Sequence, residues 1–230
     1  MSLPLLLLFK EYWRGLIPPL TQTMLGLAKI YAEAYPQPLR PYEAYLKSPY
    51  QLSTVYKATK SLHRKRLILC GRDGCVASVK ASIALLYHDD LEGATYAKYI
   101  WELNHVDEDS LLAYLVVLGA ALKKLGFSLT EAYICPREGP LLYIQVFIRG
   151  WYSSLSKTLG VPNHVLRLAY KVHMEIAEPY MSSIDGVRVL LRKDKLSVNV
   201  VAAKCPRQPT CGHELPEECP LVREAIRRLS

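Results

Sequence analysis

The sequence predicts an α+β protein with three parts: helices followed by a β-hairpin, an α+β region with an antiparallel sheet, and a cysteine-rich C-terminal segment. Apolar residues recur every three to four positions in the first third and alternate with period two further along. Three of the six cysteines fall in the last 26 residues. A chain of 230 residues, half of them apolar, can build such cores. We expect domain boundaries at 1–83, 84–203 and 204–230.

The first third contains three predicted helices. Apolar residues from Leu20 to Tyr31 follow helical spacing, and Pro36 ends this helix. A short second helix covers residues 42–46 and stops before Pro49. Ser53 is the expected N-cap of a third helix. One face of that helix is apolar, with Val55, Ala58, Thr59 and Leu62, and the other is polar, with Lys57, Lys60, Ser61 and Arg64.

A hairpin is expected directly after the third helix. Residues 67–70 and 75–79 are apolar runs of strand type, and Gly71-Arg72-Asp73-Gly74 between them is a turn sequence. Cys70 and Cys75 flank this turn and face each other across it. Their spacing permits a disulfide if the Cα atoms lie within about 4.4–6.8 Å, and a plain packing role or a redox pair is the alternative.

Positive charge is concentrated in the same stretch. The chain has 29 Lys and Arg against 21 Asp and Glu, a formal net charge of +8. From Arg40 to Lys80, nine cations and two anions give +7, so the rest of the chain is almost neutral. A surface that only needs to be soluble mixes the two signs. The asymmetry therefore favours a nucleic-acid-binding surface.

Residues 52–68, Leu-Ser-Thr-Val-Tyr-Lys-Ala-Thr-Lys-Ser-Leu-His-Arg-Lys-Arg-Leu-Ile, resemble the recognition helix and first wing strand of winged helix-turn-helix transcription regulators. The chain departs from that family at Arg66, where a glycine commonly terminates the helix. The resemblance implies double-stranded DNA as partner and a homodimer. The implied nucleic-acid contacts are Thr54, Lys57, Lys60, Ser61, Arg64, Lys65, Arg66 and Arg72.

The middle region is expected to alternate helices and strands. Asp107 or Ser110 caps a helix through Leu125, extended stretches cover 127–134 and 141–148, and a helix runs to Gly160. Asn163 caps a helix that ends at Pro179, and period-two alternation on both sides of residues 192–195 predicts a hairpin. This region is expected to serve dimerisation or sensing.

The order of these elements distantly resembles the homing-endonuclease-like DNA-binding domain. In that family a helix ends on a metal-binding carboxylate, whereas here residues 118–126 carry Lys123 and Lys124 and no acid. The resemblance therefore implies binding without cleavage. The alternative is a nucleic-acid-processing enzyme or accessory subunit, with Asp107 and Asp109 as the test residues. Capping of helices is the preferred explanation of the acidic clusters, and we assign no catalytic residue.

The C-terminal cysteines suggest a metal site. Cys205, Cys211 and Cys219 have C-x5-C-x7-C spacing with His213 between them. Zn²⁺ on three thiolates and one imidazole fits these residues, as does an iron–sulfur cluster with a fourth ligand such as Cys135. The spacing resembles the three-cysteine loop of iron–sulfur-cluster transcription regulators. Disulfides and free thiols remain open alternatives.

The sequence also predicts the cellular setting. It has no run of the roughly 18–20 apolar residues that a membrane helix needs. The apolar residues 4–9 are not preceded by a basic region, so no signal peptide is expected and we predict a cytoplasmic protein. Asn and Gln are scarce, which is typical of proteins from hyperthermophiles. We therefore expect an archaeal source.

Overall fold

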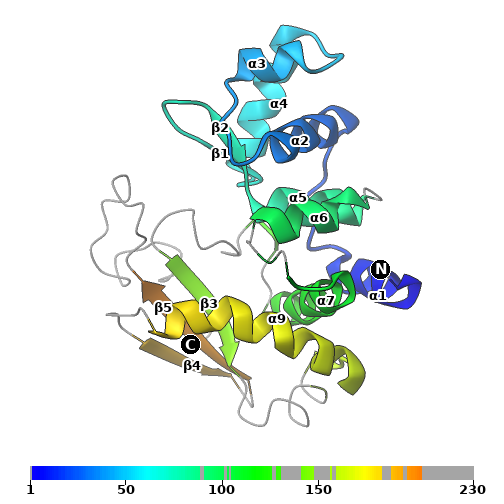
Figure 1. The fold of residues 1–230 in the computed structure, drawn as a ribbon, viewed down its shortest axis with the longest axis vertical. Coiled ribbons are helices and arrows are strands. Elements are labelled where there is room, and N and C mark those ends of the chain that lie inside the picture. Colours follow the sequence, from blue (N-terminus) through cyan, green and yellow to red (C-terminus); the bar gives the residue numbers. More distant parts are fainter. Residues whose placement is uncertain are drawn as a thin grey trace. The chain divides into compact units, whose positions relative to one another are not determined.

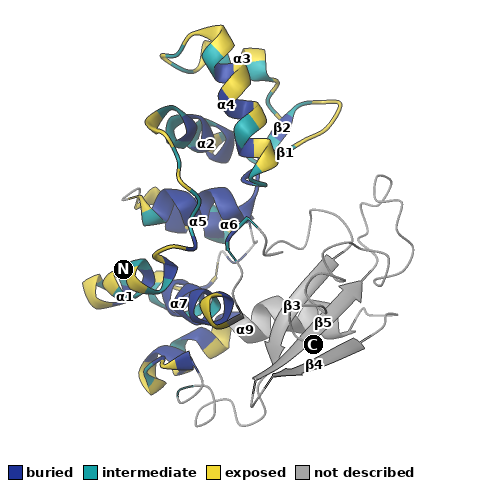
Figure 2. Cartoon of the chain, turned by 180° about the vertical axis from the view of Figure 1, so that it is seen from behind, coloured by how far each residue is buried: buried dark blue, intermediate teal, exposed yellow. Residues whose placement is uncertain are grey.

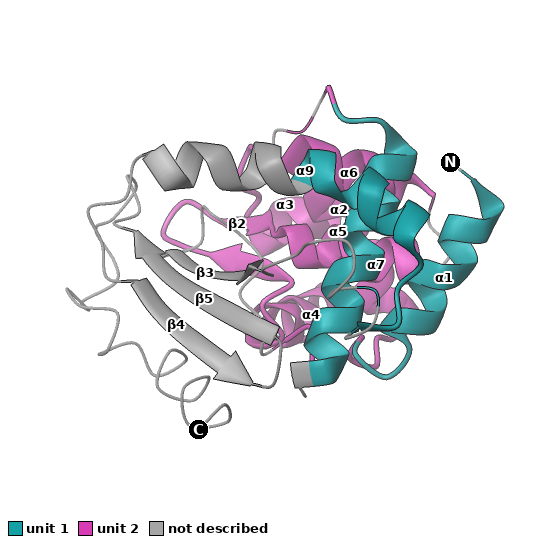
Figure 3. Ribbon diagram, turned by 90° about the horizontal axis from the view of Figure 1, so that it is seen from below, with its two compact units in different colours: residues 1–16, 106–127, 131–230 teal, residues 17–105, 128–130 magenta. Residues whose placement is uncertain are grey.

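The computed structural model describes residues 2–88, 91–100, 103, 105–125, 128–130, 141–147, 156, 159–182, 188–193 and 196–203 (Figure 1). The chain forms two compact units (Figure 3). One contains residues 17–105 and 128–130, and the other residues 1–16, 106–127 and 131–230. Helices and antiparallel strands occur together, in agreement with the predicted α+β class. The expected boundary after residue 83 lies inside one helix, Val79–Tyr87.

The unit of residues 17–105 is helical with one small hairpin. Its helices are α2 (Gln22–Ala34), α3 (Pro41–Leu46), α4 (Leu52–Arg64), α5 (Val79–Tyr87) and α6 (Glu92–Ile100). Strands β1 (Ile68–Cys70) and β2 (Cys75–Ala77) pair antiparallel, with Cys70 opposite Cys75. Helix α2 packs against α4, α5 and β2, and α3 packs against α4. The buried residues, dark blue in Figure 2, include almost all of α5.

Helix α4 buries the face that the sequence predicts. Val55, Ala58, Thr59 and Leu62 are its buried residues. The predicted cap is wrong, because the helix begins at Leu52 and Gln51 occupies the N-cap position. The amides of Thr54 and Val55 both donate to the carbonyl of Gln51, so the first turn closes before a cap at Ser53 could act.

Arg66 follows α4 at the position where a glycine is expected. Arg66 has a φ of 58°, the left-handed conformation in which a glycine is usual. The hydroxyl of Ser78 lies 2.8 and 2.9 Å from the carbonyl oxygens of Arg66 and Leu67 and shares its single proton between them. This shared hydrogen bond ties the residue that follows β2 to the two residues that precede β1. Strand β2 therefore stops at Ala77, and the predicted continuation to Val79 is wrong because Val79 already begins α5.

The second unit joins helices to a three-stranded sheet. Its elements are α1 (Leu3–Trp13), α7 (Glu108–Leu125), α9 (Asn163–Ser182), β3 (Leu141–Phe147), β4 (Arg188–Lys193) and β5 (Leu196–Ala203). The sheet order is β3-β5-β4, antiparallel throughout, and β4 and β5 form the predicted hairpin. Helix α7 packs against α1 and α9. The indole of Trp13 on α1 donates to the carbonyl of Leu115 on α7 at 2.8 Å.

Two predictions for the middle of the chain need correction. Helix α9 continues through Pro179 to Ser182. The proline removes one amide donor and crowds the carbonyl one turn earlier, but the residues after it keep their own amide donors and can complete the last turn. The extended stretch predicted over 127–134 does not form at Ser128–Thr130, where Leu129 and Thr130 lie in a turn. The rest of that stretch lies outside the described residues. Within the described part of the chain, no helix has the length and apolar character required to cross a bilayer.

Candidate nucleic-acid interface

A groove of about 590 Å³ lies between α4, the start of α3 and the β1–β2 hairpin. We call it the α4–hairpin groove. Helix α4 contributes five residues to it, and residues 40–42 and the hairpin contribute the others. The lining residues are Arg40, Pro41, Tyr42, Tyr56, Lys57, Thr59, Lys60, His63, Cys70, Gly71, Arg72, Gly74 and Cys75.

A backbone bridge brings the start of α3 beside the hairpin. Leu39 and Cys75 exchange two backbone hydrogen bonds of 2.8 and 2.9 Å, an isolated antiparallel bridge that joins Leu39 to strand β2. Directly after this bridge, the amide of Arg40 donates to the Glu43 carboxylate at 2.7 Å and begins α3. Arg40 is thereby held at the groove although it is far from α4 in the sequence.

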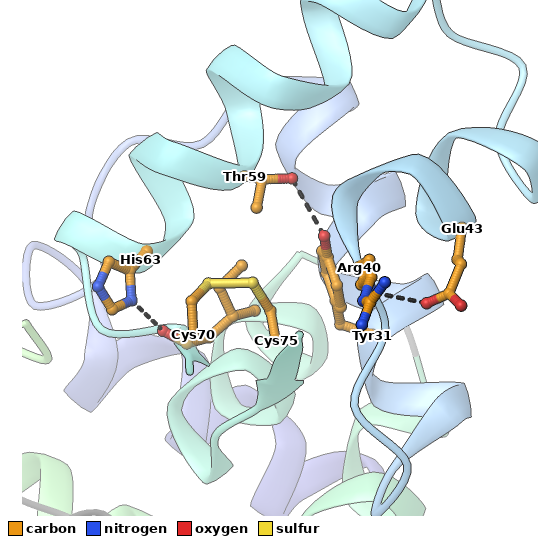
Figure 4. Close-up of a disulfide and its surroundings, with 8 residues drawn as sticks. Tyr31, Arg40, Glu43, Thr59, His63, Cys70 and Cys75 are labelled. Atoms are coloured by element: carbon orange, nitrogen blue, oxygen red, sulfur yellow. Dashed lines mark hydrogen bonds between the residues drawn. A yellow bond between two sulfur atoms is a disulfide. The ribbon is translucent and has the colours of Figure 1, made fainter. Parts of the chain in front are cut away.

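The hairpin is closed by a disulfide and a tight turn (Figure 4). Cys70 and Cys75 are bonded, with their Cα atoms 3.9 Å apart, which is closer than the expected range of about 4.4–6.8 Å. The amide of Gly71 donates to the carbonyl of Gly74 at 2.8 Å. Arg72 lies exposed in the four-residue loop between the two cysteines. A cation is therefore presented by a short, cross-linked loop at the edge of the groove.

A buried hydrogen bond joins helix α4 to helix α2. The hydroxyls of Tyr31 on α2 and Thr59 on α4 share a hydrogen bond, with 3.2 Å between the oxygens (Figure 4). Burial raises the pKa of Tyr31 above its ordinary value of 10.0, against the smaller lowering effect of the bond to Thr59. At the other end of α4, Nδ1 of His63 lies 3.3 Å from the carbonyl oxygen of Ile68 in β1. The first contact joins α4 to α2, and the second joins α4 to the hairpin.

The groove combines cations with exposed aromatic rings. Arg40, Lys57, Lys60 and Arg72 line it, and among the described residues none of its lining residues is acidic. The side chains of Tyr42 and Tyr56 are 52% and 50% exposed at the same place. Such a surface attracts polyanions and offers flat apolar rings to them.

The structure brings together some of the predicted contact residues. Lys57, Lys60 and Arg72 line the groove, and Arg64 is exposed on the same outward face of α4 as Lys57 and Lys60. The other predicted contacts are half-buried and are not among the lining residues; they are Thr54, Ser61, Lys65 and Arg66.

The sequence analysis did not identify four cationic or aromatic residues of the groove, which are Arg40, Tyr42, Tyr56 and His63. Tyr56 and His63 follow the helical spacing of Lys60 and could have been read from it. Arg40 and Tyr42 reach the groove through the bridge between Leu39 and Cys75, a long-range contact that no local pattern reveals.

Comparison with known proteins identifies no relative. No protein-family description matches the chain, and no curated protein or solved structure is significantly similar to it.

Asp107 and Asp109, the test residues of the enzyme alternative, accept hydrogen bonds at the N-terminal ends of α7 and α1. The Asp107 carboxylate accepts hydrogen bonds from the amide and the hydroxyl of Ser110 at 2.8 and 2.7 Å. Asp109 accepts from the amide of Ser2 at 2.6 Å. Asp107 is thus the predicted cap of α7. In the part of the chain that the structure describes, no three His, Cys, Asp or Glu residues gather as a metal site would need.

The predicted metal ligands Cys205, Cys211, His213 and Cys219 lie outside the described residues, as does Cys135.

Proposed function

We propose that residues 17–105 form a winged helix-turn-helix unit that binds double-stranded DNA, and that the protein is a transcription regulator. The order of elements supports this proposal: α2, the isolated bridge at Leu39, α3, α4 and a hairpin. The single observation that carries it is the outward face of α4. Lys57, Lys60 and Arg64 are all exposed there, opposite the buried apolar face.

Helix α4 has the dimensions and the chemistry of a recognition helix. The major groove of B-DNA is about 12 Å wide and an α-helix with its side chains measures about 10–12 Å across. The lysines and Arg64 of α4 then lie within reach of phosphates and base edges. Arg72 on the hairpin loop meets the sugar–phosphate backbone beside the occupied groove.

DNA affinity of a charge-depleted variant tests the proposal. We expect Lys57→Ala/Lys60→Ala/Arg64→Ala to weaken binding to a blunt 20-base-pair duplex at least roughly tenfold, measured by fluorescence anisotropy. The matched control is Lys123→Ala/Lys124→Ala/Arg167→Ala, which removes three exposed cations from the other unit. Equal affinities of both variants would overturn the proposal.

The sensing and dimerisation parts of the proposal rest on the sequence. We propose that Cys205, Cys211, His213 and Cys219 hold Zn²⁺ or an iron–sulfur cluster and that the protein is a homodimer, as the resemblance implies. Metal content and visible absorption of anaerobically purified protein test the first point. Light scattering of the protein as it elutes from a size-exclusion column tests the homodimer. An apparent mass of 26.0 kDa, the mass of one chain, would contradict a homodimer.

A further inference from the structure

The α4–hairpin groove is hollow on the scale of a small ligand. Its volume of about 590 Å³ lies in the range of about 300–1,000 Å³ that small-molecule sites occupy. A B-DNA duplex is too wide to enter such a hollow and can only lie across it. A single base that has left the helical stack is small enough to enter.

Two tyrosines give this hollow the character of a stacking site. Tyr42 on α3 and Tyr56 on α4 both line it, and each keeps about half of its surface exposed. The rest of the floor offers further apolar surface, from Pro41 and the bonded pair Cys70 and Cys75. Bases stack on exposed aromatic side chains whatever their sequence, because every base has a π-face.

Three cations line the groove where they can bind the phosphates on either side of such a base. Lys57 and Lys60 project from α4, and Arg72 projects from the hairpin loop. Gly71 beside Arg72 leaves open space, since a Cβ added there would meet no heavy atom within 4 Å. A strand can therefore pass between α4 and the loop without displacing a side chain at Gly71.

We propose that the α4–hairpin groove receives one unpaired nucleotide, its base stacked on Tyr56 or Tyr42 and its phosphates held by Lys57, Lys60 and Arg72. The preferred substrate is then DNA with an unpaired base, such as a bulge or a melted segment, rather than a fully paired duplex. This inference rests on the proposed function, since it concerns the same DNA-binding surface.

Three DNA probes test it with the full chain. They are a blunt 20-base-pair duplex, the same duplex with one unpaired thymidine in its centre, and an oligothymidylate of twelve nucleotides. We expect the bulged duplex to bind roughly tenfold more tightly than the blunt one, the gain expected from one stacked base. In Tyr42→Ala/Tyr56→Ala the ratio of the two affinities falls toward one. In Tyr42→Phe/Tyr56→Phe it is retained, because the rings remain.

A tyrosine outside the groove provides the control. Tyr99 on α6 is 45% exposed and is not a lining residue, so Tyr99→Ala should keep the preference of the wild type for the bulge. Retention of folding in each variant is checked by circular dichroism, and the phenylalanine variant separates lost stacking from lost structure.

The outcomes distinguish this inference from the proposed function. Equal binding of blunt and bulged duplexes by the wild type overturns the inference and leaves duplex binding intact. A preference for the bulge that survives Tyr42→Ala/Tyr56→Ala also overturns it. Failure to bind any of the three probes overturns both proposals. A preference for the bulge that depends on the tyrosine rings, together with binding of the oligothymidylate, supports the inference.

Discussion

Leu39 and Cys75 exchange backbone hydrogen bonds in both directions, 2.9 Å from the Leu39 amide to the Cys75 carbonyl and 2.8 Å in reverse. This pair joins the segment before α3 to the hairpin after α4. Arg40 and Tyr42 reach the α4–hairpin groove because of it. The shape of the proposed DNA-binding surface therefore depends on a contact between residues 36 positions apart in the sequence.

Gly74 is required for this bridge. Its φ is +138°, and an added Cβ would lie 2.6 Å from the carbonyl carbon of Leu39 and 2.9 Å from the amide nitrogen of Arg40. We expect Gly74→Ala to lower the free energy of unfolding by about 1–3 kcal/mol, measured by urea denaturation. Gly71→Ala is the matched control, since it has open space around it. Similar losses in both variants would contradict this role of Gly74.

Reduction of the disulfide should destabilise the hairpin unit. The Cys70–Cys75 bond spans a sequence separation of 5, and the loop-entropy relation gives about 2 kcal/mol for so short a loop. We expect a loss of about this size when a thiol-free reductant is added during urea denaturation. Cys70→Ala/Cys75→Ala should respond much less to the reductant. An equal loss of stability in this variant would show that the reductant acts through the other cysteines.

The hydrogen bond between Tyr31 and Thr59 should show a measurable coupling. Both side chains are buried, so Tyr31→Phe leaves the Thr59 hydroxyl without this partner and costs about 1 kcal/mol of stability. In a double-mutant cycle with Thr59→Val, the interaction energy should be about 0.5–1.5 kcal/mol. Strictly additive losses in thermal or urea unfolding would show that the bond does not stabilise the orientation of α4.

Asp107 should make the stability of the other unit depend on pH. Its pKa lies below the ordinary value of 3.8, chiefly because the carboxylate accepts a hydrogen bond from the Ser110 side chain. A lowered pKa in the folded state stabilises the protein fully above the unfolded value, and this contribution is lost as the pH falls through the folded value. We expect Asp107→Ala to cost about 1 kcal/mol at pH 7.

The loss caused by Asp107→Ala should shrink below about pH 3.8 in urea denaturation. Asp107→Asn is the control, because a neutral amide can still cap the helix and does not titrate in this range. A loss that stays constant from pH 7 to pH 3 would contradict the electrostatic part of this account.

Local periodicity was enough to predict α2, α3, α4, α7, α9 and both hairpins, but it did not predict α1 or α5. The buried face of α4, with Val55, Ala58, Thr59 and Leu62, follows from spacing alone. The ends of elements were less predictable, since Ser53 did not become the cap and β2 stopped before Val79. The start of α4 depends on the carbonyl of Gln51, which accepts from the amides of Thr54 and Val55. The end of β2 depends on Ser78, whose partners Arg66 and Leu67 precede the hairpin.

The groove was predictable only in part. Lys57, Lys60 and Arg72 lie in the segment of high positive charge, and the sequence identified them as contacts. Tyr56 follows from the helical spacing of α4, whereas Arg40 and Tyr42 reach the groove through the Leu39–Cys75 bridge, which no run of residues encodes locally.

The salt dependence of duplex binding tests the central claim most directly. The logarithm of the affinity for a blunt duplex should fall linearly with the logarithm of the salt concentration. In Lys57→Ala/Lys60→Ala/Arg72→Ala the slope should be shallower by about 0.9 for each removed cation that neutralises a phosphate. A wild-type affinity that does not change with salt, or the same slope in both proteins, would contradict the assignment of this groove as a DNA-binding surface.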